Sequence, residues 1–179
     1  MFEGWDSFYL LIGGASGALI GLLFVVVTLT TNLDRTQALR GAQVYMTPTV
    51  FHFAIVLSIS ALTAVPHLPG RAAAGLIGLA AGLGFIYAAN VWRMMRRRAM
   101  PAPADPAHWT DVWCYAVWPG VIYLAMAGAA AALATGETWA TDAVGAVTLA
   151  LILLGIRNAW DLVTYLAPVA HDAAAGPPG

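Results

Sequence analysis

The chain has 179 residues, of which 60% are hydrophobic and only 9% are charged. An ordinary soluble domain carries about 25% charged residues, so this deficit excludes that class and indicates a polytopic membrane protein. The net charge of −1 argues against a nucleic acid partner. Cys114 is the single cysteine, which excludes an internal disulfide and a cysteine-based metal centre, and we expect neither a metal nor a cofactor.

Five apolar segments are candidates for crossing a membrane, which takes about 20 helical residues. The sequence therefore predicts an all-α fold. It is expected to form a single domain, residues 1–179, built as a bundle of five transmembrane helices with a flexible tail at residues 167–179. The predicted spans cover residues 8–31, 48–65, 72–91, 112–135 and 143–163.

The first segment carries Gly13, Gly17 and Gly21 at intervals of four residues, which places them on one face of a helix. In water, each such glycine weakens a helix by about 1 kcal/mol relative to alanine. In a bilayer, the same glycines let another backbone approach closely, and such packing joins membrane helices. We expect this helix to be central to the bundle or to join copies of the protein into a homo-oligomer. Pore lining is the alternative role for the glycines.

The second segment begins at Thr47-Pro48, a pair typical of a helix start, and His52 follows about one turn later. The third segment repeats the small-residue pattern at Gly78 and Gly82, which we expect to pack against a neighbouring helix. It ends near Asn90, and four arginines there are expected to bind anionic lipid headgroups: Arg93, Arg96, Arg97 and Arg98.

The fourth segment begins near Asp111, where a carboxylate is favoured by the helix dipole. Pro119 and Gly120 lie inside this segment and form a predicted hinge. The proline should bend the helix because it leaves the carbonyl of Tyr115 without its usual donor.

The fifth segment has an apolar run, residues 143–156, that is short for a full crossing. To span the bilayer, its helix must include Arg157, Asn158 and Asp161. Arg157 and Asp161 lie four residues apart, so they either pair with each other or contact a substrate or ion.

The arginines are divided unevenly between the two sides of the predicted bundle. The second connection holds Arg71 and the fourth holds none, whereas the first and third hold Arg35, Arg40 and the cluster of four that follows Asn90. The positive-inside rule therefore places the N-terminus outside and the C-terminus in the cytoplasm. The exclusive use of arginine in an alanine-rich chain favours a GC-rich bacterial genome, and hence the bacterial inner (plasma) membrane.

With this topology, polar side chains gather at the cytoplasmic ends of the predicted helices. Ionisable groups at membrane depth usually face protein or water. We therefore predict an ion or substrate pathway lined by Arg157, Asp161, Asn158, His52, Asn90 and Asp111. The alternatives are structural: a hydrogen bond from His52 to a neighbouring helix, a helix cap at Asp111, and an ion pair between Arg157 and Asp161.

Two functional hypotheses follow from these features. The first is a homo-oligomeric channel or small transporter with a cytoplasm-facing polar vestibule, in which Arg157 favours an anion and His52 adjusts conduction with pH. The second is a non-transporting accessory or regulatory subunit of a larger membrane complex. A membrane enzyme is less well supported, because the sequence contains no HExxH, GxSxG or Walker motif and suggests no catalytic residues.

Overall fold

The structure, a computed structural model, describes residues 2, 4–30, 47–98 and 112–175 of the chain. Within these ranges the chain is helical apart from short turns and contains no strand. Four helical stretches are long and apolar enough to cross a membrane, and a fifth, shorter helix is also apolar. The predicted all-α membrane bundle is therefore confirmed.

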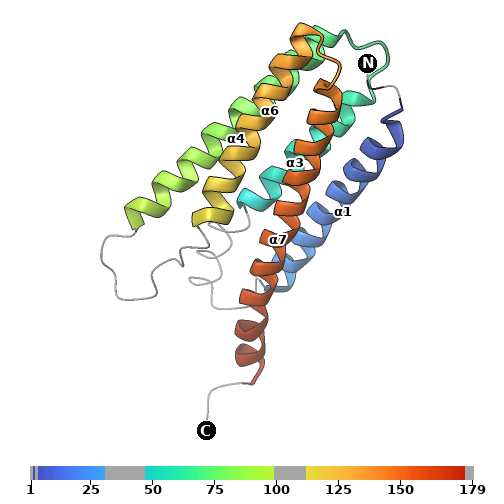
Figure 1. Cartoon of the computed structure of the whole chain (residues 1–179). Helices are drawn as coiled ribbons and strands as arrows, with labels where there is room; N and C mark the ends of the chain where they lie inside the picture. The colour runs from blue at the N-terminus through green and yellow to red at the C-terminus, as the bar shows by residue number, and fades with distance from the viewer. Residues whose placement is uncertain (1, 3, 31–46, 99–111, 176–179) are drawn as a thin grey trace.

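The described residues form five helices, a π-helical turn, and the short turns that follow α3 and α6. In chain order the helices are α1 (Asp6–Thr30), α3 (Thr47–Thr63), α4 (Gly70–Arg98), α6 (Trp118–Thr135) and α7 (Ala140–Ala175). The π-helical turn, η2 (Trp113–Val117), leads directly into α6. Successive helices run in opposite directions, so the two chain termini lie at opposite ends of the bundle (Figure 1). We refer to these as the N-terminal end and the C-terminal end.

The turn after α6 shows how a glycine stops a helix in this chain. Gly136 has a φ of 83°, in the left-handed region where a residue without a Cβ meets no steric penalty. Its N–H bonds to the carbonyl of Leu133, and the N–H of Glu137 bonds to the carbonyl of Ala132. This is the Schellman pattern, which satisfies the last carbonyls of a helix. The turn therefore reverses the chain and brings α7 back along α6.

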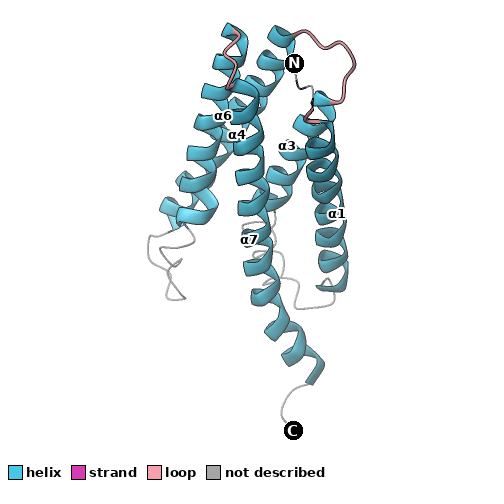
Figure 2. Cartoon of the chain, turned by 45° about the vertical axis from the view of Figure 1, so that its right-hand side comes forward, coloured by secondary structure: helices cyan, strands magenta, loops and turns pink. Residues whose placement is uncertain are grey.

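Helix α1 lies at the edge of the bundle. Four helices pack in a closed arrangement, in which α4 lies against α6, α6 against α7, α7 against α3, and α3 against α4. Outside it, α1 lies against α3 and α7 (Figures 1 and 2). The expectation of a central first helix is therefore wrong. The physical reason is that large side chains of the other helices fill the core, among them Phe53, Tyr123 and Leu151.

Close approach inside the bundle occurs mainly between glycines and aromatic rings. A Cβ on three of the glycines would collide with a ring from another helix or from the N-terminus: Gly84 with Tyr123, Gly155 with Phe53, and Gly145 with Trp5. Each ring therefore lies directly on a helix backbone, which keeps the interior dense. None of these three glycines was singled out by its spacing in the sequence, because the partner of each is a ring from a distant segment.

Helix α7 is longer than a membrane crossing requires. Its 36 residues span about 54 Å at 1.5 Å per residue, against a hydrocarbon thickness of about 30 Å. Figure 2 shows its last turns extending past the other helices at the C-terminal end. The predicted tail at residues 167–179 is helical as far as Ala175, because alanine-rich sequence favours continuation of a helix. Its flexibility stays a prediction. Residues 176–179 lie outside the described residues.

Candidate functional site

His52 lies on α3, on the face turned toward the bundle interior, and is fully buried. Its Nδ1 atom is 2.8 Å from the hydroxyl oxygen of Tyr123 on α6. Gly84 on α4 leaves the space that the Tyr123 ring occupies. Residues of three helices thus combine to form the hydrogen bond between His52 and Tyr123 inside the core. This is the structural alternative considered for His52.

One nitrogen of the His52 ring remains without a hydrogen bond. Among the described residues, Nε2 is buried and has no partner. Either Tyr123 donates to Nδ1 while Nε2 carries the ring proton, or Nδ1 donates to Tyr123 while Nε2 is a bare acceptor. The centroid of the His52 ring also lies 6.2 Å from that of Phe51. The Phe51 ring in turn stacks on the ring of Tyr87 on α4, with 4.4 Å between their centroids. The Phe51 ring thus lies between His52 and Tyr87 in a chain of ring contacts.

Asn158 on α7 is fully buried and joins α7 to the π-helical turn. Its side-chain Nδ2 donates to the carbonyl of Cys114 at 3.1 Å, and the hydroxyl of Tyr115 donates to the backbone carbonyl of Asn158 at 3.1 Å. The two bonds run in opposite senses between the same two segments. They hold the start of the α6 region against α7.

Pro119 explains why the carbonyl of Cys114 is reached by a side chain. In η2 the backbone bonds span five residues, and the N–H of Trp118 bonds to the carbonyl of Trp113. The matching donor for Cys114 would be residue 119, which is a proline and has no N–H. The expectation that Pro119 acts on the carbonyl of Tyr115 assumed α-helical spacing, and the π register moves the effect to Cys114. Gly120, the other half of the predicted hinge, directly follows Pro119 within α6.

Arg157 and Asp161 form an ion pair along one face of α7. Arg157 Nη1 lies 2.8 Å from Asp161 Oδ2, and the two side chains are 43% and 37% exposed. The same guanidinium nitrogen donates to Asn158 Oδ1 at 3.3 Å. Both charges are therefore engaged by α7 itself, as in the structural alternative. Further along the same helix, Thr164 bonds to the carbonyls of Trp160 and Asp161.

The remaining predicted pathway residues do not join these contacts. Asn90 is exposed on α4, where its Oδ1 accepts a bond from Arg93 at 3.4 Å. Asp111 lies outside the described residues. Of the arginine cluster, Arg96 lies over the ring of Trp92 at 4.8 Å from the centroid. The predicted residues thus fall into separate groups: His52 with α6, Arg157, Asn158 and Asp161 with α7 and η2, and Asn90 on the outside of α4.

Tyr123 is the residue of this site that sequence reasoning missed. It lies in the middle of an apolar segment, and a tyrosine buried at such a position usually finds a partner for its hydroxyl. That signal was available in the sequence. The sequence did not show that Tyr123 is the tyrosine that bonds to His52. Tyr87 and Tyr115 also lie in or beside apolar segments and are equally plausible partners of His52 from sequence.

The glycines predicted to pack between helices differ in what they contact. A Cβ on Gly13 would lie 2.8 Å from the Cβ of Ser60, and one on Gly78 would lie 3.8 Å from the Cβ of Ala130. These two glycines therefore face a neighbouring helix. The other three have nothing within 4 Å of such a Cβ: Gly17, Gly21 and Gly82.

The cavities in the described part of the molecule include two that lie between helices. One, of about 350 Å³, lies between the α6 segment and α7 and has Leu153, Leu154 and Arg157 among its lining residues. The other, of about 390 Å³, lies between α1 and α3 at the N-terminal end. Within the described ranges, no group of histidine, cysteine and acidic side chains is arranged to hold a metal ion.

Three sets of polar contacts lie in the C-terminal half of the bundle, and the cavity between α1 and α3 lies at the opposite end. The contacts are the bond between His52 and Tyr123, the pair of bonds between Asn158 and η2, and the ion pair on α7. No protein-family model, curated protein or solved structure matches the chain.

Proposed function

We propose that the protein is a small membrane subunit that associates with a neighbouring membrane helix through the outer face of α1 and has a structural or regulatory role there. The supporting observation is the exposed small-residue surface of α1. Gly14, Gly17 and Gly21 are exposed, and a Cβ on any of them would meet nothing within 4 Å. In a bilayer, glycine surfaces of this kind allow helix backbones to approach closely.

The polar residues of the predicted pathway also favour this role over conduction. His52 bonds to Tyr123, Asn158 bonds to Cys114, and Arg157 pairs with Asp161. A group that is held inside its own chain is less available to a passing ion, because releasing it would leave its partner unsatisfied.

The association can be tested with the purified full chain in lipid nanodiscs or mild detergent. Gly17→Leu places a large side chain on the outer face of α1 and should shift the particle to a smaller mass. Gly128→Leu is the matched control, because Gly128 on α6 is also exposed with nothing within 4 Å. Cross-linking followed by mass spectrometry identifies the neighbour as a second copy or as another protein. If the mass of Gly17→Leu equals that of the wild type, the proposed surface is wrong.

A homo-oligomeric anion channel is the second candidate, and one observation favours it. Arg157, Asp161 and Thr164 follow one face of α7, with the arginine 43% exposed. Charged groups on a membrane helix are costly unless they face protein or water, so this face would suit a path between copies. Chloride flux in proteoliposomes tests the idea: wild type should conduct and Arg157→Ala should not, whereas Arg71→Ala should behave as wild type.

We also propose that the chain spans the bacterial inner membrane with its N-terminus outside. The arginines at the C-terminal end of α4 support this orientation, since positive charge is retained in the cytoplasm. Arg93, Arg96, Arg97 and Arg98 would then meet anionic lipid headgroups. A reporter protein fused to the C-terminus should be active only if that end is cytoplasmic.

A further inference from the structure

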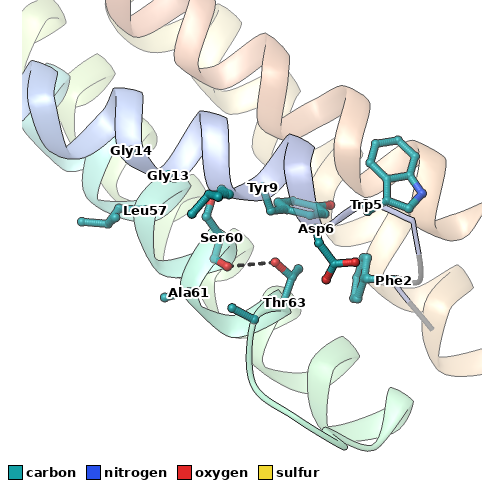
Figure 3. A pocket seen from close by; sticks show the side chains of 12 residues that line it. Phe2, Trp5, Asp6, Tyr9, Gly13, Gly14, Leu57, Ser60, Ala61 and Thr63 are labelled. Atoms are coloured by element: carbon teal, nitrogen blue, oxygen red, sulfur yellow. Dashed lines mark hydrogen bonds between the residues drawn. The ribbon is translucent and has the colours of Figure 1, made fainter.

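The cavity between α1 and α3 shares Gly14 with the exposed glycine surface of α1 but has features of its own. It has a volume of about 390 Å³ and lies where α1 begins and α3 ends. Pockets that bind small molecules commonly have such volumes, with mainly apolar walls and a few polar groups that converge. Figure 3 shows the side chains of Tyr9 and Ser60 between the two helices, with the carboxylate of Asp6 beside the ring of Phe2.

Two buried hydroxyl groups in the cavity wall have no hydrogen bond. Tyr9 is 3% exposed and Ser60 is 6% exposed. Among the described residues, the hydroxyl oxygens of both side chains are buried and without a partner. The bond that Thr63 makes to Ser60 goes to the backbone carbonyl, so it leaves the serine hydroxyl unsatisfied. A buried polar group without a partner is costly, and such groups often mark a missing ligand.

The cavity also brings together a negative charge and aromatic rings. Asp6 begins α1 and lines the cavity, as do Phe2 and Trp5. The rings of Phe2 and Tyr9 meet edge to face with 5.6 Å between their centroids, and the centroids of the Trp5 and Tyr9 rings are 6.1 Å apart. Aromatic rings beside a carboxylate attract a cation, because the face of each ring carries negative charge. The Asp6 carboxylate supplies the opposite charge directly.

We propose that this cavity binds the primary ammonium group of an amphiphile. A primary ammonium has three N–H donors, and three of the residues that line the cavity carry acceptors: the Asp6 carboxylate, the Tyr9 hydroxyl and the Ser60 hydroxyl. A quaternary ammonium could contact the rings but has no proton for the two hydroxyls. The apolar part of the ligand would lie toward the bilayer along Leu10, which is 80% exposed, and Leu57.

The ammonium group could belong to a membrane lipid or to a free amine. Both would place the charge at the level where α1 enters the membrane, since α1 is a candidate span from Asp6 onward. The two sources are separated by the probes used: phosphatidylethanolamine, phosphatidylcholine with the same acyl chains, and octylamine.

The experiment measures thermal unfolding of the purified full chain in a non-ionic detergent during titration with each probe. Phosphatidylethanolamine should raise the Tm in a saturable way, at a concentration at least about tenfold lower than phosphatidylcholine requires, because charged hydrogen bonds are lost with the latter. A rise with octylamine and none with phosphatidylethanolamine would support the cavity with a free amine as its ligand. Equal responses to the two phospholipids, with no response to octylamine, would overturn the proposal.

Substitutions locate the effect in the cavity. Asp6→Asn should raise the half-saturating concentration by at least about tenfold, through loss of a charge-assisted bond. Asp142→Asn is the matched control, because Asp142 is likewise an acidic residue in the first turn of a helix that begins at the N-terminal end. If Asp6→Asn binds as the wild type does, the carboxylate has no role and the proposal fails.

The hydroxyls provide a second measurement that does not depend on Asp6. Without ligand, Tyr9→Phe and Ser60→Ala should keep or raise the Tm, because each removes an unsatisfied buried group. With ligand, each should gain less than the wild type, whereas Ser58→Ala, on the exposed side of α3, should gain as much. Full gain in both Tyr9→Phe and Ser60→Ala would overturn the proposal.

Discussion

Glycines serve opposite purposes in the core of the bundle and on α1. In the core, Gly84 and Gly155 lie directly under the rings of Tyr123 and Phe53, where a Cβ would collide. On α1, Gly17 and Gly21 face outward and a Cβ would meet nothing within 4 Å, although their regular spacing is the more conspicuous pattern in the sequence. Regular spacing shows that a close approach is possible, whereas only the neighbouring side chain shows that it occurs within the chain.

The largest difference between the two regions is expected on addition of a single methyl group. Gly84→Ala should lower the free energy of unfolding by about 3 kcal/mol, because its Cβ would displace the Tyr123 ring and its bond to His52. Gly17→Ala should leave it unchanged or raise it by up to about 1 kcal/mol, since alanine favours a helix. Equilibrium unfolding in mixed micelles measures both. Equal effects would remove the distinction between the two regions.

A somewhat smaller effect is expected when the buried hydrogen bond of the core is broken without changing its shape. Tyr123→Phe should cost about 2 kcal/mol, because both nitrogens of the His52 ring are then unsatisfied. The double variant Tyr123→Phe, His52→Leu removes both polar partners and should recover most of that loss. The same unfolding measurement tests this, and a double variant less stable than the single one would contradict it.

The hydrogen bond from Asn158 on α7 to the Cys114 carbonyl of η2 should contribute less to the free energy of unfolding, about 1 to 2 kcal/mol. The reason is that its loss leaves only one carbonyl without its side-chain donor. Asn158→Leu keeps the side chain close to its original size and removes the bond to Cys114, together with the long bond that Asn158 accepts from the exposed Arg157. Asn90→Leu, on the exposed surface of α4, should change the free energy of unfolding by no more than about 0.5 kcal/mol. If the two variants are equally stable, the proline-linked carbonyl does not need Asn158.

The smallest effect is expected at the ion pair on the outer surface of α7. Arg157→Ala or Asp161→Ala should cost less than about 1 kcal/mol, because exposed pairs four residues apart contribute little. The loss of stability should be measured both in the monomer and in the assembled particle. A loss well above 1 kcal/mol in the assembled particle alone would show that association covers this face, as an oligomeric channel requires.

The candidate site was predictable in kind but not in pairing. The sequence suggested that His52 either bonds to a neighbouring helix or lines a pathway, and that Arg157 and Asp161 either pair or contact an ion. The structure pairs His52 with Tyr123 and Arg157 with Asp161. The second of these pairs follows from a spacing of four residues on one helix. The first joins residues 52 and 123 on different helices, and no local spacing relates them.

The π-helical turn illustrates the same limit at the level of the backbone. A proline inside an apolar segment predicts a disturbed helix, and the structure has one just before Pro119. Whether the disturbance is a kink or a π turn depends on which carbonyl finds another donor. Asn158 on α7 donates to Cys114, so the outcome depends on a residue of another helix.

The sequence by itself determined the membrane class, the apolar helical segments and the places where α6 and α3 stop. These properties follow from the length of apolar runs and from prolines and glycines, which act on the chain locally. Only the tertiary structure decided that α1 lies at the edge, which glycines are covered by rings, and which polar side chains meet. Each of these depends on how a helix is rotated about its axis and on what lies against it, and mostly apolar helices carry little local information about that rotation.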